Sequence, residues 1–418
     1  MRILLSAYAC RPDTGSEPAQ GWGWATHLAE RGHDVHVLVA KRNQESIEAG
    51  QGRQAYPNLS FTYVPVRYDW AKKWEGLHYA LWQPAALRAA RELCSKVRFD
   101  VIHHVTYASV HVPSQLWRLG NPMVFGPVGG GQTAPADMLE YFGGEQHKER
   151  LRTILTRSLA ASPLHRFCLA RTDYVLAANS DTLELVRATG CDRASVMCDT
   201  AVPDEYLAEA PIRFQDRSGP LRLIWVGRML PRKALSLALD VMREVKTDVT
   251  LTIAGDGLDP KIVRKLISSR GLQHRVFWEG RRLSSDELRS AFSQHDGMLF
   301  TSLRDSFGSQ VLEAMAQALP VIALDLSGVR DHVPLNASMK VHVSTPVETV
   351  RALADTIDKY ALLPGKVKSE MSRHALDFAK RMRWSERIAV IEKIYDKLCA
   401  SAVPLPSSSG SSLVTAKT

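Results

Sequence analysis

The sequence predicts an α/β protein built on two sheets of parallel strands, because short aliphatic runs alternate with helix-like segments along most of the chain. Its 418 residues exceed the size of most single hydrophobic cores, which favours two domains. A polar stretch rich in proline and glycine, from Pro203 to Pro220, separates the two series of strands. We therefore expect a first domain over residues 1–205 and a second over residues 206–384.

The expected strands are short runs of aliphatic and β-branched residues. In the first domain they are Ile3–Ser6, Val35–Val39, Phe61–Val64, Val101–His103, Met123–Phe125 and Tyr174–Ala177, and in the second they are Leu223–Val226, Leu251–Ala254, Val276–Trp278, Met298–Phe300 and Val321–Ala323. The first run leads directly into a polar turn, so we interpret it as a strand and not as an export signal.

The net charge of +9 lies mostly in the second half of the chain. Residues 206–418 contain 31 Lys and Arg against 23 Asp and Glu, whereas residues 1–205 contain 22 against 21. A basic half suits a polyanionic ligand such as a nucleotide diphosphate, although a nucleic acid or an anionic membrane surface would fit this charge equally well. Beyond Ala400 the composition changes to proline, serine and glycine, so residues 401–418 are expected to be disordered.

Several common site types are missing from the sequence. The six cysteines are scattered without zinc-like spacing, and we expect reduced thiols in a cytoplasmic protein. Neither Gly21-Trp-Gly23 nor Gly255-Asp-Gly257 continues to the third glycine of a dinucleotide fingerprint, which excludes a typical nicotinamide-dependent dehydrogenase. Gly365-Lys366 is not followed by Ser or Thr, so a phosphate-binding loop of that type is also excluded.

Two loops of the second domain carry the strongest signals. Arg228 and Lys233 directly follow the strand ending at Val226, near the start of a helix that we expect at about Arg232. Ligands of parallel α/β sheets bind at the carboxyl ends of the strands, so two cations and a helix N-terminus there indicate a diphosphate site. By themselves the same residues would also fit a basic surface loop.

The second loop also follows a strand and reads Asp305-Ser-Phe-Gly308-Ser-Gln-Val-Leu-Glu313. Gly308 allows a close approach of the backbone to a ligand, and the carboxylate of Glu313, on a helix expected from Val311 to Ala318, can accept both hydroxyls of a ribose. A carboxylate on a helix is more often surface decoration, so the two loops have to be considered together.

Together these segments resemble the donor half of family 4 glycosyltransferases. The resemblance includes Gly227-Arg228 with Lys233, Ala254-Gly-Asp-Gly257, Val276-Phe-Trp-Glu-Gly280 and the block from Asp305 to Ile322, in this order and spacing. It extends to the first half, where Gly15-Ser-Glu17 and Leu28-Ala-Glu-Arg-Gly-His33 are similar to the family's glycine-rich first loop and the end of its first helix.

The resemblance implies a GT-B architecture, in which two Rossmann-like domains face a cleft and a last helix, over residues 385–400, crosses back onto the first domain. It also implies sugar transfer with retention at the anomeric carbon. Arg228 and Lys233 would bind the diphosphate, Glu313 the ribose and Asp305 the donor sugar. The backbone of Phe307 and Gly308 would pack at the sugar and phosphates, and Gly15 would belong to the donor-binding residues.

Metal-independent chemistry is expected, because no Asp-x-Asp pair occurs in the chain and cations in the cleft can stabilise the departing diphosphate. Neither a metal site nor a cofactor is predicted. Two positions depart from the family pattern: Asp305 stands where Glu is usual, and Ala234 stands where Gly is common. These departures concern the preference for the donor sugar more than activity.

In the first domain, two segments are candidates for the catalytic side of the site. Many relatives place a histidine after the strand that here ends at Phe125, but this chain reads Gly126-Pro-Val-Gly-Gly-Gly131. Backbone N–H groups of Gly129 to Gly131 would bind a phosphate or sugar oxygen there, unless the segment is a surface loop. One of His103 and His104 should point into the cleft, and we select His104 as a catalytic candidate, with a structural role as the alternative.

Two segments mix basic, aromatic and aliphatic residues, as do segments that lie on anionic membranes. Arg67 to Arg98 contains seven Lys and Arg and three acids, and Gln146 to Thr172 contains six Lys and Arg and one acid. Packing on the protein's own domain is the alternative reading of both. The expected location is therefore the cytoplasm, with peripheral association with the inner face of the plasma membrane left open.

The expected partners are a nucleotide-sugar donor and a saccharide or lipid-linked acceptor, and no nucleic acid. Synthesis of an extracellular or envelope polysaccharide is expected by analogy. Two alternatives remain within the same architecture. A sugar-nucleotide epimerase would bind the same donor without passing its sugar to an acceptor, and a non-catalytic relative would bind a nucleotide only.

Overall fold

The computed structural model describes residues 1–12, 15, 17–51, 56–66, 74–212, 214 and 219–401. Within these residues there are two parallel sheets, with seven strands in the order β3-β2-β1-β4-β5-β6-β7 and six strands in the order β10-β9-β8-β11-β12-β13. Residues 402–418, residues 67–73 of the first basic segment and Ser16 of the glycine-rich loop lie outside this description.

The first sheet comprises β1 (Arg2–Ala7), β2 (Asp34–Ala40), β3 (Leu59–Val64), β4 (Val101–Thr106), β5 (Met123–Val128), β6 (Tyr174–Ala177) and β7 (Ala194–Val196). Its helices are α1 (Glu17–Glu30), α2 (Gln44–Gln51), α3 (Glu75–Lys96), α4 (Gln146–Ser158), α5 (Pro163–Ala170) and α6 (Ser180–Ala188). Every pair of neighbouring strands is parallel, and buried aliphatic clusters cover both faces of the sheet.

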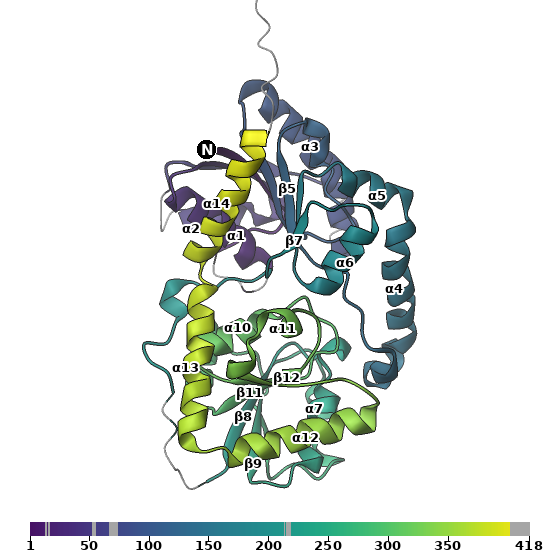
Figure 1. The fold of residues 1–418 in the computed structure, drawn as a ribbon, viewed down its shortest axis with the longest axis vertical. Helices are drawn as coiled ribbons and strands as arrows, with labels where there is room; N and C mark the ends of the chain where they lie inside the picture. Colours follow the sequence, from purple (N-terminus) through teal and green to yellow (C-terminus); the bar gives the residue numbers. More distant parts are fainter. Residues whose placement is uncertain are drawn as a thin grey trace, which may run out of the picture.

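The second sheet comprises β8 (Leu221–Val226), β9 (Val249–Ala254), β10 (Val276–Trp278), β11 (Gly297–Phe300), β12 (Val321–Leu324) and β13 (Ser338–Val341). Its helices are α7 (Leu235–Glu244), α8 (Pro260–Ser268), α9 (Ser285–Ser293), α10 (Ser309–Ala316), α11 (Ser327–His332), α12 (Pro346–Leu362) and α13 (Gly365–Arg381), followed by α14 (Trp384–Ser401). The predicted two-sheet α/β fold is confirmed, and in Figure 1 the two sheets lie one above the other.

All the strands predicted from the sequence are present, but two strands were missed. Both β7 and β13 are edge strands of three or four residues, and each leaves some of its residues partly exposed. An edge strand is covered less completely than a central one, so its sequence carries a weaker aliphatic signal. The order of the strands changes direction between β1 and β4 and between β8 and β11, which marks the usual ligand-binding point of each sheet.

The chain crosses between the domains twice, at adjacent positions. The backbone N–H of Val202 donates to the carbonyl of Met382 at 3.1 Å, so the outgoing and returning segments are paired. Beyond this point α14 lies against α1, as Figure 1 shows. A side chain at Gly23 would lie 2.1 Å from the ring of Trp384, so this glycine lets α14 pack closely on the first domain. The crossing helix expected from the resemblance is therefore confirmed.

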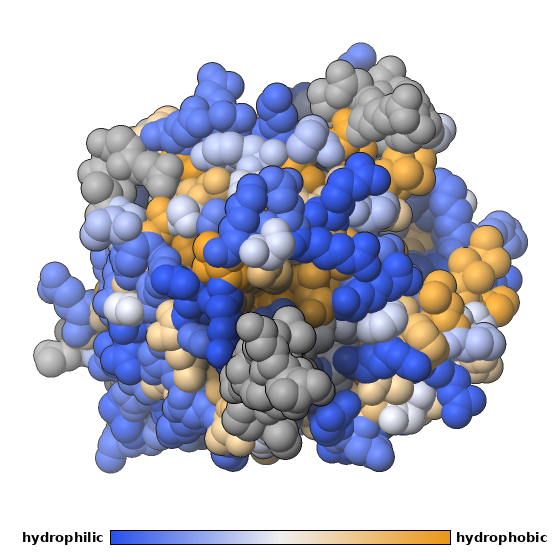
Figure 2. All heavy atoms as spheres, turned by 90° about the horizontal axis from the view of Figure 1, so that it is seen from above, coloured by the Kyte–Doolittle hydropathy of each residue, from blue (hydrophilic) through white to orange (hydrophobic). Residues whose placement is uncertain are grey.

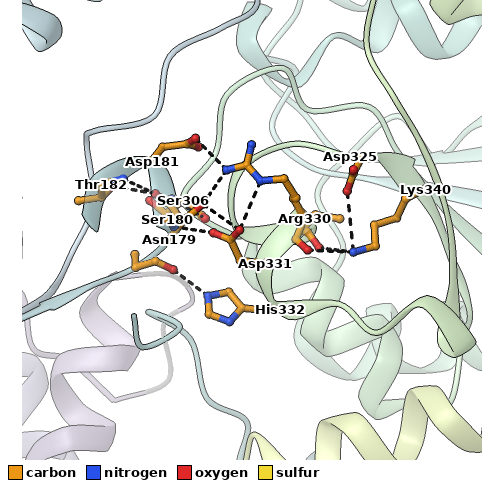
Figure 3. Close-up of polar contacts among 12 residues, drawn as sticks. Asn179, Ser180, Asp181, Thr182, Ser306, Asp325, Arg330, Asp331, His332 and Lys340 are labelled. Atoms are coloured by element: carbon orange, nitrogen blue, oxygen red, sulfur yellow. Dashed lines mark hydrogen bonds and ion pairs between the residues drawn. The ribbon is translucent and has the colours of Figure 1, made fainter. Parts of the chain in front are cut away.

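A polar network joins α6 of the first domain to α11 of the second (Figure 3). Asp331 accepts hydrogen bonds from the backbone N–H of Ser180 at 2.5 Å and from its hydroxyl at 2.9 Å. The guanidinium of Arg330 lies 2.8 Å from the carboxylate of Asp181. The carboxylate of Asp331 thus lies at the N-terminus of α6, where the helix dipole favours negative charge, and this holds the domains together on one side of the cleft.

Candidate active site

Loops from both domains meet where the strands of the two sheets end. The amide of Gln132, after β5, donates to the hydroxyl of Ser306, after β11, at 3.3 Å. The amide of Asn179, after β6, donates to the backbone carbonyl of Ser306 at 2.9 Å, a contact drawn in Figure 3. The loop from Thr301 to Gly308, which contains the predicted donor residues Asp305, Phe307 and Gly308, therefore forms one wall of an interdomain cleft.

Lys233 and Asp305 form a largely buried ion pair in this wall. Arg232 approaches the other carboxylate oxygen of Asp305 at 3.3 Å. Burial alone would raise the pKa of Asp305, but Lys233 and Arg232 outweigh it and hold that pKa below its usual value. Burial lowers the pKa of Lys233, with Asp305 opposing the shift. The site therefore contains two cations and a carboxylate that is ionised at neutral pH.

The loops after β8 and β11 are tied together by further hydrogen bonds. The indole N–H of Trp225 donates to Thr301 at 3.0 Å, and the hydroxyl of Thr301 donates to the carbonyl of Lys233 at 3.1 Å. The predicted helix near Arg232 is shifted, because Pro231–Lys233 forms a 3-10 turn and α7 begins only at Leu235. Between them Ala234 has φ +50°, a left-handed conformation that favours glycine, which explains why this position is commonly Gly.

Arg228 differs from its neighbours because it is exposed. Its side chain forms no hydrogen bond or ion pair with any of the described residues. It lies close enough to Lys233 to lower the pKa of that ammonium group. A cation at the end of β8 that is not paired with an acid in the described part of the chain is well suited to bind a diphosphate.

The remaining predicted donor residues lie on the same wall. Phe307 is fully buried and packs edge-on against His332, with ring centroids 5.7 Å apart. Gly308 precedes α10 with φ +100°, and a side chain there would lie 2.9 Å from the ring of Phe300. Burial raises the pKa of Glu313 on α10, although Ser309, Arg282 and Lys233 oppose the rise. The structure thus brings these residues and Lys233 together.

The first loop of the N-terminal domain faces the donor wall. A side chain built on Gly15 would lie 3.6 Å from the guanidinium of Arg282 in the second domain. Glu17 accepts a hydrogen bond from the backbone N–H of Tyr107 at 3.0 Å. Desolvation by the surrounding protein raises the pKa of Glu17 to about 7, and the nearby Asp199 adds to this rise. Asp199, which follows β7 in the first domain, was not selected from the sequence.

The expectation that His104 faces the cleft is wrong. The ring is fully buried, with one nitrogen 3.1 Å from the hydroxyl of Ser6 and the other 3.0 Å from the hydroxyl of Tyr79 on α3. His103 points to the other side of the sheet, as strand alternation requires, but it is also fully buried and contacts Tyr395 of α14. Burial lowers the pKa of each histidine to about 3, so both rings are neutral core residues.

The backbone N–H groups of Gly129 to Gly131 are also not free to bind a ligand. They donate to the carbonyl of Ala108, the side chain of Gln132 and the hydroxyl of Thr182, respectively. Close packing accounts for two of these glycines. A side chain at Gly131 would lie 2.5 Å from the backbone of Thr182, and one at Gly129 would lie 2.7 Å from the hydroxyl of Ser306.

Several residues that shape the cleft were missed by the sequence analysis. Arg152 on α4 donates to the carbonyls of Gln132 and Gly130 at 3.1 and 3.3 Å. Glu149, also on α4, is buried and forms an ion pair with Arg304 at 2.7 Å, directly before Asp305. In the sequence, Arg232 was used only to mark the expected start of a helix, although its position next to Lys233 already indicated a possible binding residue. The other contacts join distant segments and carry no local signal.

Among the described residues, no group of three or more His, Cys, Asp or Glu side chains is arranged to hold a metal ion. Metal independence stays a prediction. Within the same part of the chain, no helix has the length and hydropathy needed to cross a bilayer.

Two family models match the chain. Residues 21–198 match the model described as a glycosyl transferase 4-like domain, and residues 210–378 match the model described as glycosyl transferases group 1. The boundary between the two matches falls in the linker between the two sheets. Together they include most of both domains.

Similar proteins agree with these models. The chain is 21% identical over 344 residues to N-acetyl-alpha-D-glucosaminyl L-malate synthase of Bacillus anthracis, with 78% of this chain and 80% of that protein aligned. It is 26% identical over 340 residues to 2-deoxystreptamine N-acetyl-D-glucosaminyltransferase of Streptomyces fradiae, with 75% of this chain and 77% of that protein aligned. An uncharacterized glycosyltransferase of Methanocaldococcus jannaschii aligns over only 48% of its length and 42% of this chain, at 22% identity.

Solved structures share the fold. Sucrose-phosphate synthase from Thermosynechococcus elongatus superimposes with a TM-score of 0.67 at 16% identity, covering 96% of this chain and all of that one. Taken together, the two domain matches, the similar enzymes and the shared fold show that this chain belongs to the family 4 type of glycosyltransferases and has the GT-B architecture.

Proposed function

We propose that this glycosyltransferase moves a hexose-type sugar from a nucleotide-diphosphate donor to a saccharide or lipid-linked acceptor, with retention at the anomeric carbon and without a metal ion. The observation that carries the proposal is the arrangement of Arg228, Lys233 and Arg232 at the end of β8, facing Asp305 after β11. We assign the diphosphate to these cations and the ribose hydroxyls to Glu313.

The charge at this site suits the chemistry of the leaving group. When the glycosyl bond breaks, the nucleotide diphosphate gains negative charge, which fixed cations stabilise as it forms. Lys233 is held by Asp305 within the buried loops, so it is already oriented. Arg228 is exposed and is therefore available to a phosphate, which makes it the strongest candidate for stabilising the leaving group.

Uridine nucleotides are the first donors to test. A solved structure of Anabaena HepE, determined in complex with UDP-glucose, superimposes with a TM-score of 0.59 at 14% identity. The two similar enzymes from Bacillus anthracis and Streptomyces fradiae are named for N-acetylglucosaminyl transfer. Retention and metal independence rest on membership of the family and on the lack of an Asp-x-Asp pair in the sequence.

The first test is a thermal-shift experiment with UDP, GDP and ADP and their common sugars, in the presence of EDTA. A ligand that binds only the folded state raises the melting temperature. We expect one nucleotide diphosphate to stabilise the wild type, Glu313→Ala to abolish that shift, and Glu244→Ala, an exposed carboxylate on α7, to preserve it. If the site requires a metal ion, no nucleotide will raise the melting temperature in the presence of EDTA.

Product analysis then separates transfer from the alternatives. Incubation of the identified donor with candidate acceptors should give a glycoside whose anomeric configuration, measured by NMR, matches that of the donor. An epimerised donor formed without an acceptor would instead identify an epimerase, and binding without turnover would identify a nucleotide-binding relative. We propose glycoconjugate or polysaccharide synthesis in the cytoplasm as the setting.

A further inference from the structure

We propose that α4 and α5 form a docking surface for an anionic lipid bilayer. We call this the α4–α5 surface and define it by the exposed residues of Gln146–Ser158 and Pro163–Ala170, with Arg171. This proposal goes beyond sugar transfer, because it concerns binding of the enzyme to a membrane. It is tested by measuring binding to lipid vesicles alone.

The apolar side chains of this surface are unusually exposed. They are Leu151, Ile154 and Leu155 on α4 and Leu164 and Phe167 on α5, with exposed fractions between 46% and 64%. Their spacing of three and four residues places those of α4 on one face of the helix, and the two of α5 on one face of theirs. Figure 2 shows apolar atoms at the right edge of the upper face, the side on which Figure 1 places α4 and α5.

The exposed charged residues of the same surface are all cationic. Its exposed basic side chains are Lys148, Arg150, Arg157, Arg166 and Arg171. The single acid between residues 146 and 172, Glu149, is 4% exposed and points inward to Arg304. Burial of this acid leaves the outer side of the helices with positive charge beside leucine, isoleucine and phenylalanine.

A small cavity lies within this surface. Its volume is about 340 Å³, and it is lined by His111, Lys148, Leu151, Arg152 and Leu155. Lys148 and the two leucines can accommodate the phosphate and the first methylenes of an anionic lipid, whereas Arg152 already donates to two backbone carbonyls.

The combination of features favours a bilayer over a protein partner. Exposed apolar side chains enter the headgroup region, and each Lys or Arg beside them adds about 1 kcal/mol of attraction to an anionic leaflet. Five exposed cations match a uniformly negative surface, although one of them, Lys148, also lies 3.5 Å from the exposed carboxylate of Glu145. A typical protein interface is instead depleted of charge at its centre.

The inner side of α4 reaches the active-site cleft. Arg152 holds the carbonyls of Gly130 and Gln132, and Glu149 pairs with Arg304 beside Asp305. A bilayer bound on the outer side of α4 would therefore lie next to the cleft, as transfer to a lipid-linked acceptor requires. This consequence rests on the proposed function, whereas bilayer binding itself does not.

The test is flotation of the full-length protein with vesicles of phosphatidylcholine alone or mixed with phosphatidylglycerol. We expect binding to the anionic vesicles, little binding to phosphatidylcholine, and release as the salt concentration rises, because salt screens the cations. The variant Ile154→Gln with Leu155→Gln should bind anionic vesicles about tenfold more weakly, since two apolar side chains no longer enter the bilayer. Arg150→Glu with Arg157→Glu should weaken binding at least as much.

The matched control is Ile262→Gln on α8, an isoleucine that is 49% exposed and also lies beside basic residues. It should bind vesicles like the wild type. Unchanged nucleotide-induced thermal shifts in all variants would show that the donor site is intact. The proposal is overturned if the wild type stays unbound with anionic vesicles, if the α4 variants bind as well as the wild type, or if the surface instead mediates concentration-dependent dimers.

Discussion

The ammonium group of Lys233 forms an ion pair with Asp305, and the two residues come from loops at the ends of adjacent strands, β8 and β11. This carboxylate also lies 3.3 Å from Arg232, so one acid balances two cations. Asp305, expected to contact the donor sugar, thus has a second role that the sequence did not indicate, because it orients a buried lysine and opposes the fall in that lysine's pKa caused by burial.

Removal of this carboxylate should destabilise the protein. Asp305→Ala leaves the buried Lys233 without its partner, and we expect a loss of about 3 kcal/mol in the free energy of unfolding, measured with urea. Lys233→Met in the same background should recover part of the loss, because it removes the unpaired charge. If Asp305→Ala is as stable as the wild type, the ion pair is not important for folding.

The exposed Arg228 should behave in the opposite way. We expect Arg228→Ala to change the free energy of unfolding by less than about 0.5 kcal/mol but to reduce turnover about a hundredfold, because it removes a cation that stabilises the leaving group. Arg243→Ala, an exposed arginine on α7, is the control and should leave both quantities unchanged. Full activity of Arg228→Ala would contradict the proposed site.

Gly131 should be intolerant of even one methyl group. A side chain there would lie 2.5 Å from the backbone of Thr182, so Gly131→Ala should lower the free energy of unfolding by about 1–3 kcal/mol. No atom lies within 4 Å of a side chain built on Gly144, so Gly144→Ala should be neutral. Equal melting temperatures for the two variants would show that this segment is not tightly packed.

His104 makes stability depend on pH. The folded protein holds its pKa near 3, whereas the unfolded chain has the ordinary value of about 6.5. Only the unfolded state therefore gains a proton as the pH falls below about 6.5, and His104 can cost up to about 1.4 kcal/mol of stability for each pH unit. His103 should act in the same direction.

The variant His104→Gln keeps a polar side chain between Ser6 and Tyr79 but cannot titrate. It should be less stable than the wild type at pH 8, because the packing of the ring on Phe125 is lost. This difference should narrow between pH 7 and pH 5, as measured by urea unfolding at each pH. A constant difference would mean that the imidazole is protonated equally in both states.

The sequence predicted the central strands well, because their aliphatic runs are buried on both faces of a parallel sheet. It missed β7 and β13 because edge strands bury fewer of their residues, so their sequences contain fewer aliphatic side chains. It also selected Arg228, Lys233, Asp305 and Glu313 from short motifs after β8 and β11, and the structure places all four on one wall of the cleft. Their roles toward a donor stay predictions.

The first-domain side of the site depended on the tertiary structure. His104 follows the expected alternation of its strand, but α3 packs over that face and supplies Tyr79, so the ring is buried. The triple glycine appeared to offer free N–H groups, whereas its neighbours Thr182 and Gln132 bind two of them. A local sequence therefore determined which strands form and which loops follow them. Which polar groups remain free depended on segments that are distant in sequence, and these meet only when the whole chain has packed.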